Sequence, residues 1–332
     1  MAASRHPFLS RVLFCGAGVG LLFAGWAYER LAWNLAARQA PEAGRTVYIG
    51  GSRLQIYCTG QGSPTVILES GLGDILEQWR RVQPAVSSFA RVCSYDRAGY
   101  GSSSPGRFPR TSDQISEELH LLLQRAGERA PYVLVGHSFG GYLVRVFHGR
   151  YPSEVAAMVL VDATQEDQYK MLPPAWKALS KNLVERYRTQ ARWAPLEIGL
   201  GIKRITMTLN GAEIPNLLLQ SKYFRARASE VENIEISSEQ ARKAGNLGAK
   251  PLVVLTGGRN ADPVLTANLT EQDVEDYQRI WERELQPRLA RLSSRGKFVV
   301  LHDSGHDVPA ERPDAIIDAI REVSMDHSTA VN

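Results

Sequence analysis

The sequence YVLVGHSFGGYL (residues 132–143) joins a run of apolar residues to a glycine-rich turn around Ser138. Residues 132–136 predict a buried strand, and the residues from 139 to about 151 predict a helix. A Gly-x-Ser-x-Gly turn between a strand and a helix holds the serine hydroxyl above the carboxyl edge of a sheet. Because the chain contains 28 Gly, the pattern also arises by chance. Its position between these two elements is what favours a nucleophile over a plain tight turn.

A turn in a nucleotide-binding sheet is the other interpretation of this stretch. That interpretation requires a phosphate fingerprint, either G-x-G-x-x-G or a Walker lysine, and the sequence contains neither. The glycines that flank Ser138 let neighbouring backbone pass close to a strained turn. We therefore expect Ser138 to be a nucleophile.

The composition of the chain is that of an ordinary globular protein, with 44% hydrophobic and 22% charged residues. Its 332 residues suffice for one large domain or for a core with an inserted subdomain. The formal net charge of +4 is spread without long basic runs, which gives no reason to expect nucleic acid as a partner. The cysteines, Cys15, Cys58 and Cys93, are too few for a disulfide scaffold or a metal site.

The amino-terminal region contains an uncharged segment, residues 12–28, whose length of 17 residues is close to the shortest for a membrane-spanning helix. Trp26 and Tyr28 lie where interfacial aromatic residues would lie. We expect residues 1–41 to be a membrane anchor or signal segment plus a linker. This predicts single-pass membrane association through residues 12–28, with the body of the protein outside the cytoplasm. A cleaved signal peptide and an amphipathic or buried helix are the alternatives.

Strands and helices alternate through the rest of the chain. The predicted strands are 46–51, 53–60, 64–70, 91–96, 132–136, 156–163, 251–258 and 297–305, and the predicted helices of the core are 111–127, 139–151 and 312–323. Buried strands that alternate with helices indicate a mainly parallel sheet with helices on both faces, which is an α/β fold. The opening hairpin adds an antiparallel edge to this sheet.

The alternation is interrupted by a long charged region between Asp162 and Lys250. Stretches such as 175–193 and 237–246 are typical of helices, and a structureless loop of this length is uncommon. We therefore expect a helical insertion at the strand ends. The predicted divisions are a core of residues 42–163 and 250–325, a helical insertion of residues 164–249, and a frayed tail of residues 326–332.

A nucleophilic serine needs a base, and His306 is the candidate. It follows the last predicted strand, so it lies at the same edge of the sheet as Ser138. His302 falls inside that strand, and the side chain of His137 should point away from that of Ser138. The alternative for His306 is a solvated histidine in a surface loop.

The base needs an acid to orient it, and two aspartates lie at strand ends. Asp262 follows the strand 251–258 and falls between Ser138 and His306 in chain order. Asp162 ends the preceding strand and could also reach the histidine. We expect Asp262 to be the acid, with Asp162 as the alternative. Either residue could instead be a helix cap or a turn aspartate.

A tetrahedral intermediate also needs fixed hydrogen-bond donors for its oxyanion. One donor should be the backbone N–H of Phe139, directly after Ser138. The other should come from the glycine-containing loop after strand 64–70, and we expect it to be the N–H of Leu72. The alternative for this loop is a flexible connector.

Three motifs together resemble the α/β-hydrolase superfamily over roughly residues 45–325. They are GHSFGG (136–141), DRAGYGS (96–102), which is similar to the family's D-x-R-G-x-G-x-S loop, and SGH (304–306). The resemblance implies an eight-stranded sheet with a helical cap between the sixth and seventh strands. One departure is Ser70-Gly71, where the family commonly has His-Gly. This departure makes the substrate preference less certain and leaves the backbone donor in place.

The resemblance implies a serine hydrolase with Ser138, His306 and Asp262 as its triad, Leu72 and Phe139 as oxyanion donors, and neither a metal nor a cofactor. A serine excludes mechanisms that resemble those of haloalkane dehalogenases and epoxide hydrolases, which use an aspartate there. Acyl transfer to water remains, from a carboxylic ester, thioester or amide of a small or lipid-like substrate, or C–C hydrolysis. An acyltransferase and a ligand-binding protein on the same fold are the alternatives.

Two further expectations follow from the resemblance. The family's sheet order places the strands that carry Cys58 and Cys93 side by side and antiparallel, so the two cysteines form either a disulfide or a pair of buried thiols. Large apolar residues of the cap line an acyl pocket or form the cap's own core. These residues are Trp176, Trp193, Leu196, Leu217, Leu218, Leu219, Tyr223 and Phe224.

Overall fold

A computed structural model describes residues 20, 22–35, 44–210, 216–259, 266 and 269–331 of the chain. Its sheet has eight strands in the order β1-β2-β4-β3-β5-β6-β7-β8. The strands are β1 (Arg45–Tyr48), β2 (Arg53–Thr59), β3 (Thr65–Glu69), β4 (Val92–Tyr95), β5 (Tyr132–His137), β6 (Val155–Val161), β7 (Leu252–Gly257) and β8 (Gly296–Leu301). The first hairpin and the β2–β4 pair are antiparallel, and all other pairs are parallel. The predicted α/β class and the strand count are confirmed.

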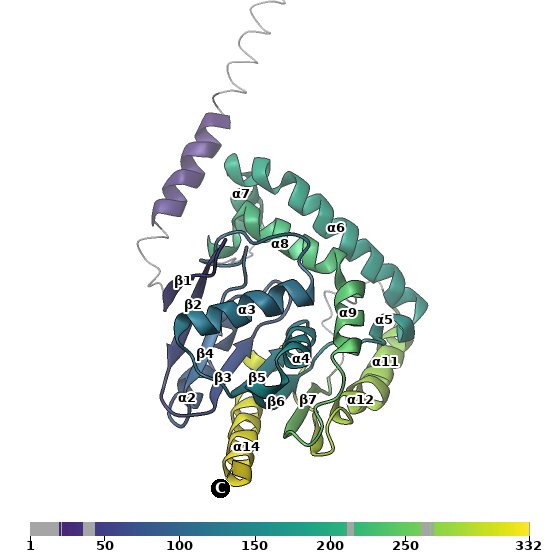
Figure 1. Cartoon of the computed structure of the whole chain (residues 1–332). Coiled ribbons are helices and arrows are strands. Elements are labelled where there is room, and N and C mark those ends of the chain that lie inside the picture. The colour runs from purple at the N-terminus through teal and green to yellow at the C-terminus, as the bar shows by residue number, and fades with distance from the viewer. Residues whose placement is uncertain are drawn as a thin grey trace, which may run out of the picture.

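Helices cover both faces of the sheet, as Figure 1 shows. One face is covered by α3 (Ser112–Ala126), α4 (Gly140–Arg150) and α12 (Gln286–Ala290), and the other mainly by α2 (Gln83–Val86) and α14 (Pro313–Val331). Alternate residues of the central strands point to opposite faces, so Leu134 packs in one core cluster and Val133 in the other. The continuous apolar runs therefore reflect strands that are buried on both sides.

The N-cap of helix α3 is Thr111, and the helix begins at Ser112. The side chain of Thr111 accepts a hydrogen bond from the N–H of Gln114, and the helix ends at Gly127 in the left-handed conformation, with φ of 74°. Thr111 takes the N-cap role because its backbone is extended there, as an N-cap residue requires.

The region between β7 and β8 contains helices that the sequence analysis did not predict. They are α11 (Glu271–Ile280), a π-helical turn η4 (Trp281–Leu285) and α12. Thr270 and Asp273 form a capping box at the start of α11. This Thr-x-x-Asp pattern is the sequence signal that could have located the helix.

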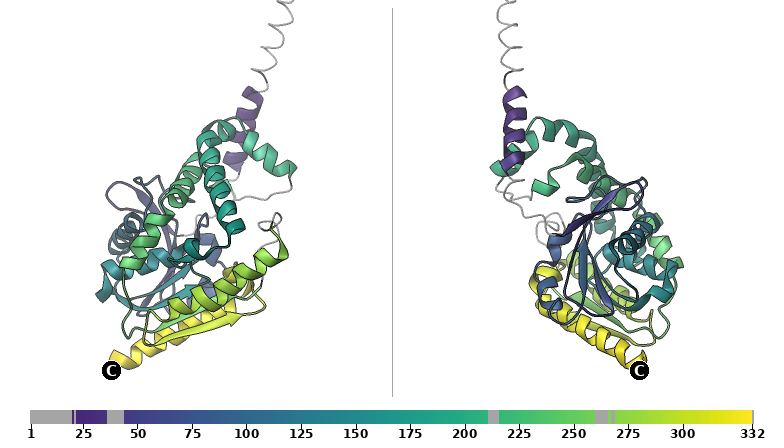
Figure 2. Two further views of the ribbon diagram at one scale, coloured as in Figure 1. Left: turned by 90° about the vertical axis from the view of Figure 1, so that its right-hand side faces the viewer. Right: turned by 60° about the vertical axis from the view of Figure 1, so that its left-hand side comes forward.

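A helical cap lies between β6 and β7, as expected. It consists of α5 (Gln168–Met171), α6 (Pro174–Gly199), α7 (Ile202–Leu209), η3 (Asn216–Leu218), α8 (Ser221–Glu232) and α9 (Ile234–Lys243). Figure 2 shows these helices arching over the sheet on the side of the amino-terminal helix. The long helix α6 packs along α8, and α9 packs on α4 of the core.

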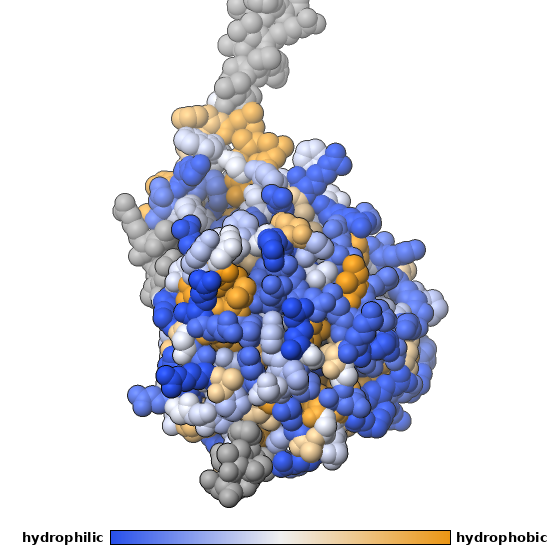
Figure 3. Space-filling model, viewed as in Figure 1, coloured by the Kyte–Doolittle hydropathy of each residue, from blue (hydrophilic) through white to orange (hydrophobic). Residues whose placement is uncertain are grey.

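The amino-terminal segment corrects the expectation of a membrane anchor. In the part of the chain that the structure describes, no helix combines the length and the apolar character needed to cross a membrane. Residues 22–35 form a helix that packs against the cap, where Arg204 donates two hydrogen bonds of 2.8 Å to Glu29. This helix has exposed apolar side chains, and an orange area lies directly below the grey atoms in the upper part of Figure 3. Residues 12–19 and 21 of the expected span lie outside the described residues.

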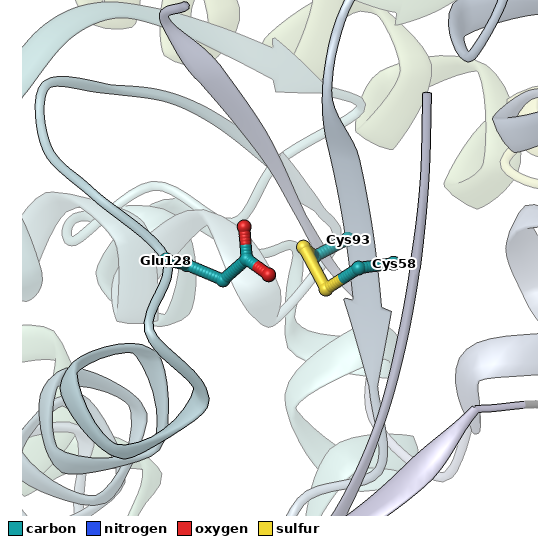
Figure 4. Close-up of side chains that lie close together, drawn as sticks. All are labelled: Cys58, Cys93 and Glu128. Atoms are coloured by element: carbon teal, nitrogen blue, oxygen red, sulfur yellow. A yellow bond between two sulfur atoms is a disulfide. The ribbon is translucent and has the colours of Figure 1, made fainter. Parts of the chain in front are cut away.

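Cys58 and Cys93 are directly opposite each other in the β2–β4 ladder and form a disulfide with an S–S distance of 2.08 Å. Of the two alternatives, the disulfide is therefore the one present. Figure 4 shows the carboxylate of Glu128 turned toward this bond. The three residues bring potential metal-ligand atoms within 4.8 Å of one another. The cysteine sulfurs are bonded to each other, and Glu128 pairs with Arg91 at 2.7 Å, so the cluster offers no thiolates to a metal.

Candidate active site

Ser138 lies on the turn between β5 and α4 with φ of 53°, in the left-handed region that non-glycine residues rarely adopt. Two glycines make this turn possible. A Cβ on Gly136 would lie 2.7 Å from the carbonyl oxygen of Gly140, and a Cβ on Gly140 would lie 2.7 Å from that of Glu69. The backbone therefore passes too closely for any side chain at these positions. The result is the strained strand-to-helix turn that the sequence predicts.

His306 is the histidine that meets Ser138. It follows β8, and its Nε2 is 3.0 Å from Oγ of Ser138. The side chain of His306 is 55% exposed, so solvent and small molecules can reach it. His302 lies just beyond the end of β8, where the predicted strand would have included it.

The acid beside His306 is Asp162, the alternative of the sequence analysis. Its Oδ2 is 2.6 Å from Nδ1 of His306. A carboxylate only accepts hydrogen bonds, so Nδ1 carries the proton and Nε2 is left to accept the hydroxyl hydrogen of Ser138. Asp262, the acid that the sequence analysis favoured, lies outside the described residues.

Three donors hold the second oxygen of Asp162. Its Oδ1 accepts hydrogen bonds from Oγ1 of Thr256 at 2.7 Å, the N–H of Gly257 at 3.0 Å and Nε1 of Trp281 at 2.8 Å. The side chain of Asp162 is only 6% exposed. Trp281 comes from the π-helical turn between β7 and β8. Its role is not predictable from the sequence, because nothing in the local pattern of Trp281 separates it from a core tryptophan.

The electrostatics of the pair favour an ionised aspartate. Burial raises the pKa of Asp162, but its hydrogen bonds with His306, Trp281 and Thr256 outweigh that effect and lower the pKa below its ordinary value. Partial burial lowers the pKa of His306, whereas the hydrogen bond and the charge of Asp162 raise it, and the net pKa lies above its ordinary value. Asp162 therefore stabilises the imidazolium form of His306.

His137 lies beside Ser138 but points to other partners, as expected. Its Nε2 donates to the carbonyl oxygen of His306 at 2.9 Å, and its Nδ1 accepts from Nε2 of Gln78 at 3.0 Å. Burial and the neighbouring His306 lower the pKa of His137 to about 3, so it is neutral and keeps this tautomer. Gln78 also accepts from the N–H of Gly71 at 3.1 Å. This network joins the histidine loop to the loop after β3.

Leu72 and Phe139 have the free N–H groups that an oxyanion hole requires. Within the described residues, neither N–H makes a hydrogen bond. Phe139 directly precedes α4, where helix geometry leaves N–H groups unpaired. A Cβ on Gly71, the neighbour of Leu72, would lie 3.4 Å from Cβ of Ser138, so this loop passes over the serine.

A pocket of about 630 Å³ meets this site at Leu72. Its apolar lining residues from the cap include Tyr169, Leu183, Val184, Tyr187, Val231 and Ile234. Leu72 and Ile234 also pack against the cluster that contains Phe139. The pocket therefore has Leu72 in its wall and extends between α6 and the α8–α9 pair.

The apolar cap residues named in the sequence analysis do not line this pocket. Leu217, Leu218, Tyr223 and Phe224 pack in a cluster with Ile75 and Tyr100, and the ring of Trp176 stacks on Tyr277 at 4.2 Å between centroids. These contacts pack the cap residues on one another and on the core. The pocket is not apparent from the sequence because its cap residues come from two separate segments, 169–187 and 231–235.

Comparisons with known proteins agree with the observed fold. Residues 64–196 match the family model of the alpha/beta hydrolase fold. A protein of Gibberella zeae named AB hydrolase superfamily protein is 27% identical over 286 residues, which covers 78% of this chain and 86% of its relative.

Two solved structures illustrate the similarity in fold. An esterase from Thermogutta terrifontis superposes with a TM-score of 0.56 and 21% identity, covering 85% of this chain and 98% of the esterase. The epoxide hydrolase CorEH superposes with a TM-score of 0.59 and 18% identity, covering 85% of this chain and 98% of CorEH. Proteins with different reactions thus share this architecture, and the reaction has to be inferred from the site.

Proposed function

Because the chain belongs to the α/β-hydrolase superfamily, we propose that it is a serine hydrolase with Ser138 as nucleophile, His306 as base and Asp162 as orienting acid. The observation that carries the proposal is the continuous hydrogen-bonded chain from Ser138 through His306 to Asp162, with distances of 3.0 and 2.6 Å. This arrangement has the three roles of a catalytic triad. Asp162 replaces Asp262 in the proposal.

The reaction follows from these positions. Oγ of Ser138 attacks the carbonyl carbon of an ester, thioester or amide while Nε2 of His306 takes the hydroxyl proton. The N–H groups of Leu72 and Phe139 stabilise the oxyanion, and His306 then gives its proton to the leaving group. Water, activated by His306, cleaves the acyl-enzyme and releases the acid.

The pocket supports a substrate with an apolar group. Its walls are mainly aliphatic and aromatic side chains, and it starts at Leu72, where the carbonyl oxygen of the substrate would be bound. Lys177, Lys181 and Glu235 also line it and bring polar groups to it. We assign the pocket to the acyl chain or to the alcohol group of a small or lipid-like ester.

The test uses the full chain, a fluorescent serine-directed fluorophosphonate and p-nitrophenyl esters of increasing acyl length. We expect the wild type to be labelled and to hydrolyse ester, and Ser138→Ala to lose labelling and about 10⁵- to 10⁶-fold in kcat. Ser116→Ala is the matched control because Ser116 is also buried but donates to the carbonyl oxygen of Leu143 on α4.

A folded wild type that is neither labelled nor active would contradict the proposal. A ligand-binding protein on the same fold would then be the favoured interpretation. Adding an alcohol acceptor and identifying the products by mass spectrometry separates a hydrolase, which forms the acid, from an acyltransferase, which forms a new ester.

A further inference from the structure

The loop that carries Leu72 is held by an unusual number of polar contacts. The N–H of Gly71 donates to Gln78, and the carbonyl oxygens of Ser70 and Gly71 accept hydrogen bonds from Arg97 at 2.8 and 2.7 Å. The carbonyl oxygen of Gly73 accepts from the hydroxyl of Tyr223 at 3.1 Å. The backbone on both sides of Leu72 is therefore fixed, while the N–H of Leu72 remains free.

Arg97 uses all five of its N–H groups in this arrangement. Nη1 donates to Glu69 and to the carbonyl of Ser70, Nη2 donates to the carbonyl of Gly71 and to Glu230, and Nε donates to Glu230. Its side chain is only 2% exposed. Because all of its N–H groups are hydrogen-bonded, the guanidinium has one orientation. Its planar geometry therefore sets the distance between the two carbonyl groups that it holds.

Two of these five bonds come from the cap. Glu230 lies near the end of α8, is fully buried, and accepts from Nε and Nη2 of Arg97 at 3.2 Å each. The hydroxyl of Tyr100 also donates to Glu230 at 2.7 Å, and the Tyr100 ring lies 4.7 Å from the guanidinium. Tyr223, which holds Gly73, is on the same helix α8. One cap helix thus reaches the Leu72 loop directly through Tyr223 and indirectly through Glu230 and Arg97.

Stability alone is a poor explanation for this cluster. Burying an arginine between two carboxylates is costly, and apolar packing of similar volume often serves stability equally well. An oxyanion donor, in contrast, has to be fixed within a few tenths of an ångström before the reaction begins. The cluster supplies such fixation at the backbone segment that carries the donor.

We infer that Glu230 is a positioning residue that sets the oxyanion donor of Leu72 through Arg97, so that the cap completes the active site of the core. The inference rests on the proposed function. It predicts that cap helix α8 controls kcat, in addition to any control of substrate binding by the pocket.

The experiment compares Glu230→Gln with Glu118→Gln in the full chain, using p-nitrophenyl esters and thermal unfolding. Glu118 is the matched control because it also forms a buried pair with an arginine, accepting two 2.8 Å hydrogen bonds from Arg110, but its bonds do not reach the Leu72 loop. We expect Glu230→Gln to lower kcat by about 10²-fold, the loss typical of one oxyanion donor. KM should change less than about threefold, and the acid limb of the pH profile should stay in place.

Tyr223→Phe is the second variant, because it removes only the hydroxyl that holds Gly73. We expect it to lower kcat by several-fold at nearly constant KM, and its result decides the inference if Glu230→Gln does not fold. Losses no larger than that of Glu118→Gln, or losses confined to KM, would overturn the inference. An inactive wild type would instead contradict the proposed function, so the two failures are distinguishable.

Discussion

Among the described residues, Ser138 and Asp162 are the only non-glycine residues with positive φ, at 53° and 41°. Each costs roughly 1–3 kcal/mol in backbone strain, which persists only where surrounding contacts enforce it. The carbonyl oxygen of Ser138 accepts from the N–H groups of Gly141 and Thr164, and the N–H of Asp162 donates to the carbonyl oxygen of Leu255. The backbone strain therefore occurs at the two residues whose side chains contact His306.

At the residue scale, the role of Asp162 is tested by its neutral isostere. Asp162→Asn should lower kcat by about 10⁴-fold, because an amide neither fixes the required tautomer of His306 nor stabilises its charge. In the wild type, kcat/KM should fall at acid pH with a midpoint above the ordinary histidine value near 6.5, since the base acts only when neutral and its pKa is raised. Asp162→Asn should move this midpoint to lower pH. Stopped assays across pH 4–9 measure both effects.

The control for this prediction is Asp262→Asn, which should retain most of the activity. Asp74 and Asp307 also help to raise the pKa of His306, so some elevation should persist without Asp162. If Asp262→Asn were inactive and Asp162→Asn active, the acid would be the one that the sequence analysis favoured.

At the scale of elements, the β2–β4 pair differs from the other strand pairs of the sheet in having a covalent link. The two strands are antiparallel neighbours, second and third from one edge of an otherwise mostly parallel sheet, and Cys58 is directly opposite Cys93. The link closes a segment of 35 residues that contains β3, α2 and the Leu72 loop. It therefore restricts, in the unfolded chain, the region that supplies the proposed oxyanion donor Leu72.

Removing this link should destabilise the protein. The double variant Cys58→Ala/Cys93→Ala should lose about 3–4 kcal/mol in the free energy of unfolding, which is the loop-closure estimate for a separation of 35 residues. Urea unfolding followed by tryptophan fluorescence measures the loss. The disulfide does not involve Cys15, so Cys15→Ala is the control and should unfold as the wild type does. Equal stability of all three proteins would contradict the prediction.

At the scale of the whole molecule, the cap and the core each supply part of the site. The core provides Ser138, His306 and Asp162 from the ends of β5, β8 and β6, whereas the cap provides most of the wall of the 630 Å³ pocket. In the proposed function, the core alone therefore specifies the chemistry, and the docking of the cap specifies the space available to a substrate.

The size of that space is testable by filling it. Val184→Trp should reduce kcat/KM for the longest accepted p-nitrophenyl ester by roughly tenfold or more relative to the acetate, because a bulky ring displaces several methylenes from the pocket. A chain-length series measures the ratio. Leu209→Trp is the matched control, since Leu209 is 80% exposed on α7. If kcat/KM fell equally for esters of all acyl lengths, the acyl chain of the substrate would bind in another region.

Much of the fold was predictable because buried parallel strands leave long apolar runs and amphipathic helices leave a periodic stripe. The disulfide partners followed from the family's strand order. The membrane anchor was a wrong prediction, because an apolar segment has the same composition whether it faces lipid or packs on another helix. Gly25 illustrates the difference, since a Cβ there would lie only 2.2 Å from the carbonyl oxygen of Leu200 in the cap. Such close packing is invisible in a hydropathy pattern.

The sequence by itself determined the sheet, the elbow around Ser138 and the histidine at the end of the last strand. These features depend on local patterns, namely apolar periodicity and the glycines that a strained turn requires. Only the tertiary structure decided that Asp162 meets His306, that Trp281 holds it and that Glu230 reaches Arg97. These contacts join residues more than a hundred positions apart, and their geometry is set by how the strand ends and the cap helices pack together.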